Sequence, residues 1–341
     1  MQSKQWQASL SVTESPDACR GLNRVAGAAD SAVSEALWPS PIPTKSKKIM
    51  KSVVTANTPS RSWSKKLIQL PLMHMIFAIF FVALPAGLTM SLGDSVGGEN
   101  VRIMWPQFLA TIVALVAYWV VVRWTEKRPV TELSGRGAAT EFTVGLLTGA
   151  LMVASVIGVL FATGVYQQPE LNGWSATVVI PFAEMLFVGV LEEVLCRGIV
   201  FHIAEKSVGT WAALIIVALL FGLAHAPGSG AGFWSISIAV VAGASLTAAY
   251  IMTRRLWLCI GIHVAWNCTL GSIFSVAVSG RQSRGLLTGK LIGPEWVTGG
   301  TYGLEASVLT LVAFVLVGGY FLWRANKAGN FIRPAWQRLT A

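Results

Sequence analysis

Long apolar segments constrain the fold of this chain more than any other feature of its sequence. Each run has about 20 apolar residues, the length that an α-helix needs to cross the hydrocarbon core of a bilayer. The alternating pattern of a membrane β-barrel is absent. The sequence therefore predicts an all-α, polytopic membrane bundle of about eight transmembrane helices. The runs cover residues 70–92, 104–123, 142–164, 174–196, 208–226, 233–252, 257–279 and 303–323.

Composition agrees with a membrane protein and argues against a soluble or nucleic-acid-binding one. The chain is 54% hydrophobic and 12% charged, whereas soluble domains carry about 25% charged residues. Its net charge is +10, but many of the basic residues stand immediately before the first apolar run, where they suit anionic lipid headgroups. We therefore expect membrane lipids as partners and no nucleic acid. The basic residues of this segment, which contains no acid, are Lys45, Lys47, Lys48, Lys51, Arg61, Lys65 and Lys66.

The apolar runs divide the chain into four predicted parts. Residues 1–67 are rich in Ser, Ala and Pro without periodicity, and we expect them to form a disordered, basic N-terminal tail. Residues 68–165 hold the first three spans, residues 166–280 the functional core, and residues 281–341 the last span and a cytoplasmic tail. Basic residues gather in alternate loops, which predicts a multi-pass protein of the cell membrane with both termini in the cytoplasm. The basic loop 280–302 departs from this pattern.

Charged residues inside the fourth apolar run need a physical explanation. The run ends in V-G-V-L-E-E-V-L-C-R-G, and one charge near the bilayer centre costs about 2.5–3.5 kcal/mol on insertion scales. Glu193 and Arg197 are four residues apart, so they share a helical face and can form a buried ion pair. Glu192 lies about 100° around the helix and lacks this partner, which makes it a candidate general base. The simpler alternative places all three charges at the headgroup level.

Two further polar pairs lie on later apolar runs. Phe221 and His225 are four residues apart in F-G-L-A-H, and His263 and Asn267 are four apart in H-V-A-W-N. Interhelical hydrogen bonds of the kind that join membrane helices would explain either pair alone. Taken together, one acid, two histidines and an amide are the groups that water-activated acyl hydrolysis requires.

The positions of these residues make a geometric prediction. The midpoint between Glu192 and His225 is near Val208, so a helical hairpin that turns there places both side chains at about the same depth in the membrane. His263 lies closer to its own turn, at 254–256. His263 lies at the same depth as Glu192 and His225 if the hairpin, including the polar segment 202–207, extends about three turns beyond the membrane. We expect this extension, with the fourth, fifth and seventh helices as neighbours around one cavity.

The three motifs, E-E-x-x-x-R, F-x-x-x-H and H-x-x-x-N in this order on apolar helices, resemble the CAAX prenyl endopeptidase and bacteriocin-processing family, also called CPBP or Abi. The resemblance covers roughly residues 174–280, and no motif position is substituted. It implies an intramembrane endopeptidase in which Glu192 and His225 activate the attacking water. His263 and Asn267 would stabilise the oxyanion. The remaining motif residues, Glu193, Arg197 and Phe221, would support the site.

The resemblance leaves the metal question open, because this family is often called metal-dependent. The chain has no H-E-x-x-H, and zinc would need Glu192, His225 and His263 from three helices to converge. Asn267 favours a metal-free mechanism, since an amide is a good oxyanion donor and an uncommon zinc ligand. We therefore expect no firm cofactor, with zinc as the alternative.

Two other classes of function compete with the peptidase. A membrane immunity or regulatory protein of the same family could bind a peptide without cutting it, and a transporter could use Glu192 and Glu193 as an ion site. The complete motif set favours an endopeptidase acting on a membrane-associated protein or peptide. The absence of an internal repeat disfavours a transporter. The sequence gives neither the cleavage motif nor the oligomeric state.

Overall fold

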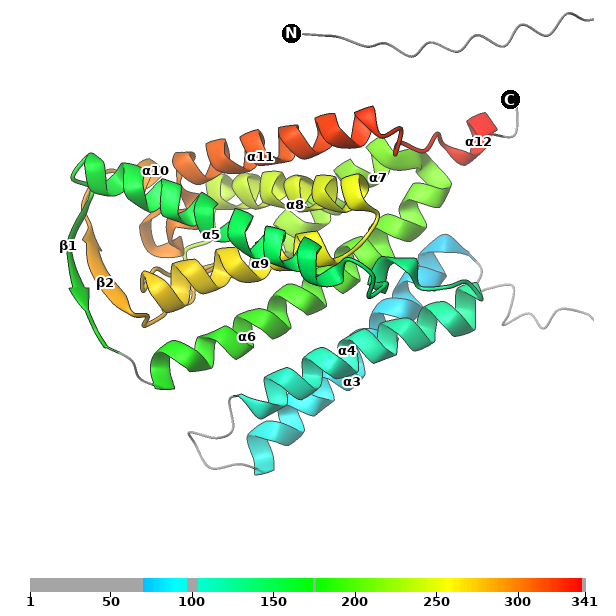
Figure 1. Cartoon of the computed structure of the whole chain (residues 1–341), viewed down its shortest axis with the longest axis horizontal. Helices are drawn as coiled ribbons and strands as arrows, with labels where there is room; N and C mark the ends of the chain where they lie inside the picture. Colours follow the sequence, from blue (N-terminus) through cyan, green and yellow to red (C-terminus); the bar gives the residue numbers. More distant parts are fainter. Residues whose placement is uncertain (1–69, 97–103, 174–175, 339–341) are drawn as a thin grey trace, which may run out of the picture. The chain divides into compact units, whose positions relative to one another are not determined.

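The computed structural model describes residues 70–96, 104–173 and 176–338. The predicted tail, residues 1–67, lies outside this range. The described part is a bundle of helices with very little strand, arranged as in Figure 1. Its long helices are α3 (Pro71–Val96), α4 (Trp105–Val121), α5 (Ala138–Ala162), α6 (Ala176–Glu193), α7 (His202–Ala224), α8 (Phe233–Thr253), α9 (Trp257–Cys268) and α11 (Val308–Lys327). Shorter pieces are α10 (Glu295–Thr298), α12 (Ala335–Arg338), η2 (Val122–Glu126), η3 (Thr131–Leu133), η4 (Val194–Phe201), η5 (Thr269–Ile273), η6 (Gly300–Tyr302) and η7 (Leu304–Ala306).

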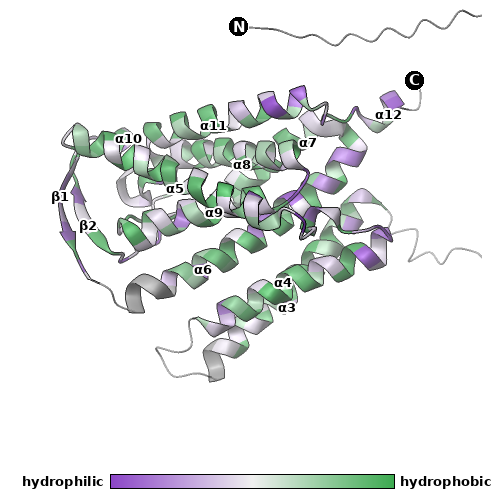
Figure 2. Cartoon of the chain, viewed as in Figure 1, coloured by the Kyte–Doolittle hydropathy of each residue, from purple (hydrophilic) through white to green (hydrophobic). Residues whose placement is uncertain are grey.

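The predicted polytopic membrane bundle is confirmed, but the count of eight spans is not. Six helical stretches in the described residues are long and apolar enough to cross a membrane. One of them, Pro181–Ala224, is 44 residues long and contains most of the predicted fourth span and nearly all of the fifth. The predicted seventh span is a shorter helix, Trp257–Ile273. Figure 2 shows hydrophobic colouring along the helix bodies and hydrophilic residues on β1, β2 and the helix ends.

The long stretch Pro181–Ala224 is a hairpin, with a sharp break at Gly209. Helical structure continues from α6 through η4 into the first part of α7, so the predicted extension over residues 202–207 is helical. Gly209 then adopts φ 80° and ψ 170°, a conformation that a side chain would disfavour. A Cβ at this position would also lie 2.8 Å from the backbone nitrogen of Pro334. Beyond the break, α7 packs along α8.

A short α9 places the third motif in the interior of the bundle. This helix packs against α5, α6 and α8, and every residue from Leu258 to Cys268 is buried. Glycines allow the close approach of α5 to α9. A Cβ at Gly261 would lie 2.4 Å from the carbonyl oxygen of Phe142, and one at Gly145 would lie 2.5 Å from that of Leu258.

A pair of antiparallel strands, β1 (Tyr166–Leu171) and β2 (Leu287–Leu291), was not predicted. They join the loop after α5 to the loop before α11, so these two loops lie at the same end of the bundle (Figure 1). Tyr166 is 3% exposed and packs edge-on against Phe274. Its ring lies over Gly289, where a Cβ would come within 2.3 Å of it.

Candidate active site

The first motif forms the buried ion pair that its spacing predicts. Arg197 Nη1 donates to Glu193 Oε1 at 2.8 Å, and both side chains are fully buried. The guanidinium also donates to the carbonyl oxygen of Gly243 at 2.7 Å and to Thr247 Oγ1 at 3.3 Å, both on α8. Its centre lies 4.8 Å from the Phe221 ring. Arg197 therefore ties the first motif to α8 and to the second motif.

A π-helical segment begins within the first motif, and another begins just after the third. The α-helix ends at Glu193 and continues as the π-helical segment η4, which contains Arg197. In the same way α9 ends at Cys268, one residue after Asn267, and continues as the π-helical segment η5. Wider turns of this kind are frequent at functional sites. Glu192 and Asn267 each lie one residue before the end of the α-helical part.

His263 lies between the two glutamates of the first motif. Its Nδ1 is 2.8 Å from Glu193 Oε1, and its Nε2 is 3.8 Å from Glu192 Oε2. Glu193 therefore supports the site in two ways, because the oxygen that pairs with Arg197 also accepts a hydrogen bond from His263. A carboxylate can only accept, so Nδ1 of His263 carries the proton of this bond.

His225 is oriented by the backbone of its own helix. Its Nδ1 lies 2.7 Å from the carbonyl oxygen of Phe221, and a carbonyl can only accept, so Nδ1 carries the proton. In the neutral imidazole Nε2 is then an acceptor. Phe221 lies 4.6 Å from the His225 ring and 6.0 Å from the His263 ring, between centroids. The Phe221 ring therefore packs against both histidine rings.

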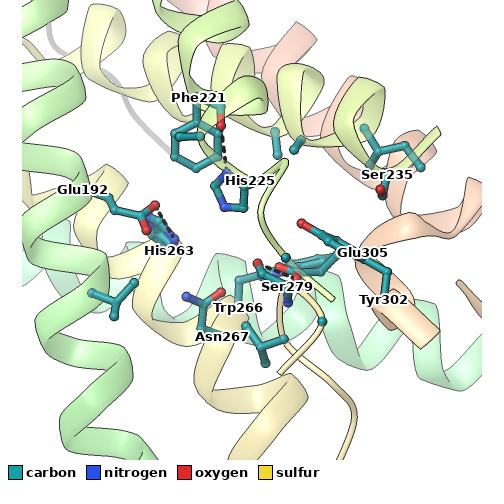
Figure 3. Close-up of a pocket in the computed structure, with 18 of the residues that line it drawn as sticks. Glu192, Phe221, His225, Ser235, His263, Trp266, Asn267, Ser279, Tyr302 and Glu305 are labelled. Atoms are coloured by element: carbon teal, nitrogen blue, oxygen red, sulfur yellow. Dashed lines mark hydrogen bonds and ion pairs between the residues drawn. The ribbon is translucent and has the colours of Figure 1, made fainter. Parts of the chain in front are cut away.

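The four predicted catalytic residues line one cavity of about 390 Å³. Glu192 and His263 lie together on one side, with His225 and Asn267 between them and the opposite wall (Figure 3). Asn267 is 4% exposed, and its side-chain amide makes no hydrogen bond with the residues that the structure describes. Glu192 Oε2 has no hydrogen-bond partner among these residues either. The cavity thus contains an unused acceptor and an unused amide.

The side of the cavity opposite Glu192 and His263 was not predicted. It has two walls, one formed by Trp266 at the end of α9 and the other by the turn that contains Ser279, and Tyr302 and Glu305 lie beside them, with Glu305 hydrogen-bonded to Ser279 (Figure 3). Burial, and next the negative charge of Glu305, raise the pKa of Tyr302 to about 12, so its phenol is neutral near pH 7. One signal in the sequence pointed to this side of the cavity. Glu305 is an acid within the predicted apolar run 303–323, and such residues are functional candidates by default.

The zinc alternative does not fit the arrangement of donors. In the described part of the chain, no group of three or more His, Cys, Asp or Glu side chains could hold a metal ion. Glu192 and His263 approach each other, but His225 does not complete a set with them. We therefore derive no chemical step through a metal.

The fold and the cavity define a polytopic helical membrane protein whose site combines a carboxylate, two imidazoles and an amide. Residues 173–269, which contain all three motifs, match the family model described as type II CAAX prenyl endopeptidase Rce1-like. The family resemblance predicted from the motifs is thereby confirmed over these residues. The description of the matched family is that of an endopeptidase. A search among curated proteins found no match.

Proposed function

We propose that this chain is an intramembrane endopeptidase that hydrolyses a peptide bond of a membrane-associated protein or peptide with an activated water. The observation that carries the proposal is the shared cavity, into which Glu192, His225, His263 and Asn267 all face. Polar groups of this kind are expensive in an apolar bundle unless they have partners or a function. Here two of them lack hydrogen-bond partners in the described residues, which suits a site that binds a reacting group.

The acceptors in the cavity would orient the water. A water donating one hydrogen to the Glu192 carboxylate and the other to Nε2 of His225 presents a lone pair to the substrate carbonyl. As this lone pair bonds to the carbonyl carbon, Glu192 takes a proton from the water, and the C=O π electrons move to the oxygen. When the tetrahedral intermediate collapses, the C–N bond breaks and Glu192 returns the proton to the leaving amine.

The donors in the cavity would stabilise the oxyanion. Asn267 offers its amide N–H groups, and His263 can donate from Nε2 when both ring nitrogens are protonated. Glu193 holds the Nδ1 side of this imidazolium at 2.8 Å, and Glu192 lies 3.8 Å from the Nε2 side. The two carboxylates favour the positive ring electrostatically. Fixed donors of this kind act strongly where water is excluded.

The surroundings of the site suit a membrane-associated peptide. Apolar side chains of α6, α8 and α11 complete the cavity, including Val188, Ile238 and Phe314. Such a wall accepts an apolar residue of a substrate and excludes bulk water. In our proposal the protein crosses the cell membrane with both termini in the cytoplasm, as the distribution of basic loops predicts. The end that carries β1 and β2 then faces away from the cytoplasm.

The test compares membrane-derived peptides from cells that express the wild-type chain, Glu192→Ala or Glu170→Ala. Glu170 is an exposed residue of β1 and serves as the control. Peptides present with the wild type and Glu170→Ala should disappear with Glu192→Ala, while all three proteins accumulate to similar levels. Unchanged peptides, together with full biological activity of Glu192→Ala, would support the non-proteolytic immunity or regulatory alternative instead.

A further inference from the structure

The carboxylate of Glu305 holds two separate walls of the cavity. Its Oε1 accepts from Trp266 Nε1 at 3.1 Å, and its Oε2 accepts from the hydroxyl of Ser279 at 3.0 Å and from the backbone N–H of Ser279. All three donors are neutral, and no salt bridge joins Glu305 to a cation in the described residues. The three motifs do not include this residue.

One of these walls is a tight turn at residues 278–281. Ser279 (φ 49°) and Gly280 (φ 79°) are both left-handed, and a β-bridge between Val278 and Arg281 closes the turn. A serine is strained in this conformation, whereas a glycine is not. The bonds from Ser279 to Glu305 therefore hold a turn that its own sequence does not favour.

The turn contacts the backbone that follows His225. A Cβ at Gly228 would lie 2.8 Å from the carbonyl oxygen of Ser279, and a Cβ at Gly280 would lie 2.1 Å from that of Ser229. The backbones of the two segments are therefore packed too closely for either to carry a side chain at these glycines. A shift of the turn therefore shifts the segment that begins three residues after His225.

The other wall is the end of α9. Trp266 is 3% exposed, and a buried indole N–H requires an acceptor, which here is Glu305. Asn267 is the next residue along the helix, and Cys268 ends it. Glu305 thus connects the Asn267 side of the cavity with the His225 side.

From this juxtaposition we infer that Glu305 is a positioning residue for the reaction, an inference that rests on the proposed function. It fixes the distance between the water-activating groups and the amide that would donate to the oxyanion. A displacement of about 1 Å in such a constellation is enough to cost about a hundredfold in rate. Gln at this position keeps the shape but offers one acceptor oxygen in place of two.

The test uses the full-length protein purified in detergent and has a readout that needs no substrate. N-ethylmaleimide labels free thiols, and mass spectrometry of peptides reports each cysteine separately. Cys268 is 8% exposed at the end of α9, and Cys259 is 0% exposed in the same helix and serves as the internal reference. Glu295→Ala, at an exposed acid of α10, is the matched control variant.

In Glu305→Ala, Cys268 should be labelled about tenfold faster relative to Cys259, because the bond from Trp266 no longer holds the end of α9 and the two bonds from Ser279 no longer hold the neighbouring turn. Glu305→Gln should lie between Glu305→Ala and the wild type. Trp266→Phe, which removes the indole donor and keeps an aromatic ring, should also raise the ratio. Glu295→Ala should leave it unchanged. Labelling of Cys268 at the wild-type rate in both Glu305→Gln and Trp266→Phe overturns the inference.

Activity separates positioning from simple stability. For the peptides that disappear with Glu192→Ala, Glu305→Gln should lower the rate of appearance about tenfold or more, at an unchanged melting midpoint and an unchanged KM. A rate equal to the wild type would overturn the positioning role. If Glu192→Ala leaves the peptides unchanged, the proposed function fails, and the Cys268 labelling ratio still decides whether Glu305 holds the two walls.

Discussion

Glu205 and Glu193 are both buried and both pair with an arginine, but their surroundings differ. At the α6–α7 hairpin turn, Glu205 accepts at both oxygens, from Arg254 at 2.5 and 3.1 Å and from Thr210 at 2.5 Å. Beside the cavity, Glu193 uses one oxygen for both Arg197 and His263, and its Oε2 has no hydrogen-bond partner in the described residues. We call these groups the turn network and the cavity network.

The difference between the networks distinguishes a structural cluster from a functional one. An unsatisfied buried acceptor costs about 1–3 kcal/mol, so folding alone favours networks in which every polar atom is paired. The turn network meets this condition and also binds the C-terminal segment, since Arg254 donates to the carbonyl oxygen of Asn330. The cavity network leaves Glu193 Oε2 and Glu192 Oε2 unpaired. Of these two residues only Glu192 lines the cavity, and an unused acceptor there is what a site for a reacting water requires.

The largest expected effect is the loss of folded protein in Arg197→Ala. This change strands the charge of Glu193 in a fully buried position, and breaking such a pair typically costs about 3–5 kcal/mol. Arg254→Ala should cost less, because the Arg254 side chain is 31% exposed and water can replace part of its bonding. Protein levels in membranes and the melting midpoint in detergent measure both effects. Arg197→Ala protein that accumulates and melts like the wild type would contradict the importance of this pair.

The second expected effect is a loss of the reaction rate in a protein that still folds. Asn267 donates no hydrogen bond to the described residues, so Asn267→Ala should fold normally. If its amide binds the oxyanion, the loss of this donor should lower the rate of peptide production by about 10²–10³. Asn267→Asp is the matched variant, because it keeps the shape and replaces the donor with an acceptor. A wild-type rate in either variant would remove Asn267 from the proposed mechanism.

Much of the fold was predictable because lipid imposes a simple length rule on helices. The hairpin turn also followed from sequence, since Gly209 stands beside the predicted Val208. The strands β1 and β2 did not, because Tyr166–Leu171 contains Pro169 and its partner lies more than 100 residues away. Nothing in the π-helical segment η4, V-L-C-R-G-I-V-F, distinguishes it by spacing from an α-helix.

The candidate site, like the fold, could be predicted only in part from the sequence. Spacing by four residues correctly placed Glu193 beside Arg197, because both belong to one helix. The contact of Glu193 with His263 joins residues 70 apart and depends on how α6 packs against α9. Helices four, five and seven were expected as mutual neighbours. The fourth and seventh, α6 and α9, do pack together, whereas α7 packs mainly along α8 and reaches His263 through the ring of Phe221. Local spacing thus predicts pairs within a helix, and helix packing decides the pairs between helices.

The smallest expected effect tests whether the turn network is purely structural. Thr210 is 1% exposed; its hydroxyl donates to Glu205 at 2.5 Å and accepts from the backbone N–H of Ile332 at 2.8 Å. Thr210→Val keeps the shape and removes both bonds, which should cost about 1–3 kcal/mol, toward the lower end because Arg254 still pairs with Glu205. Thr163→Val, at an exposed threonine after α5, is the control.

Thr210→Val should lower the melting midpoint and leave peptide production unchanged at temperatures where the protein is folded. The physical reason is distance: 18 residues separate Thr210 from Glu192, which corresponds to more than about 20 Å of helix up to the break at Gly209. Energetic effects at well-separated sites are usually additive. A variant that melts like the wild type but produces peptides more slowly would show instead that the hairpin turn is coupled to the cavity, and that the two networks are not independent.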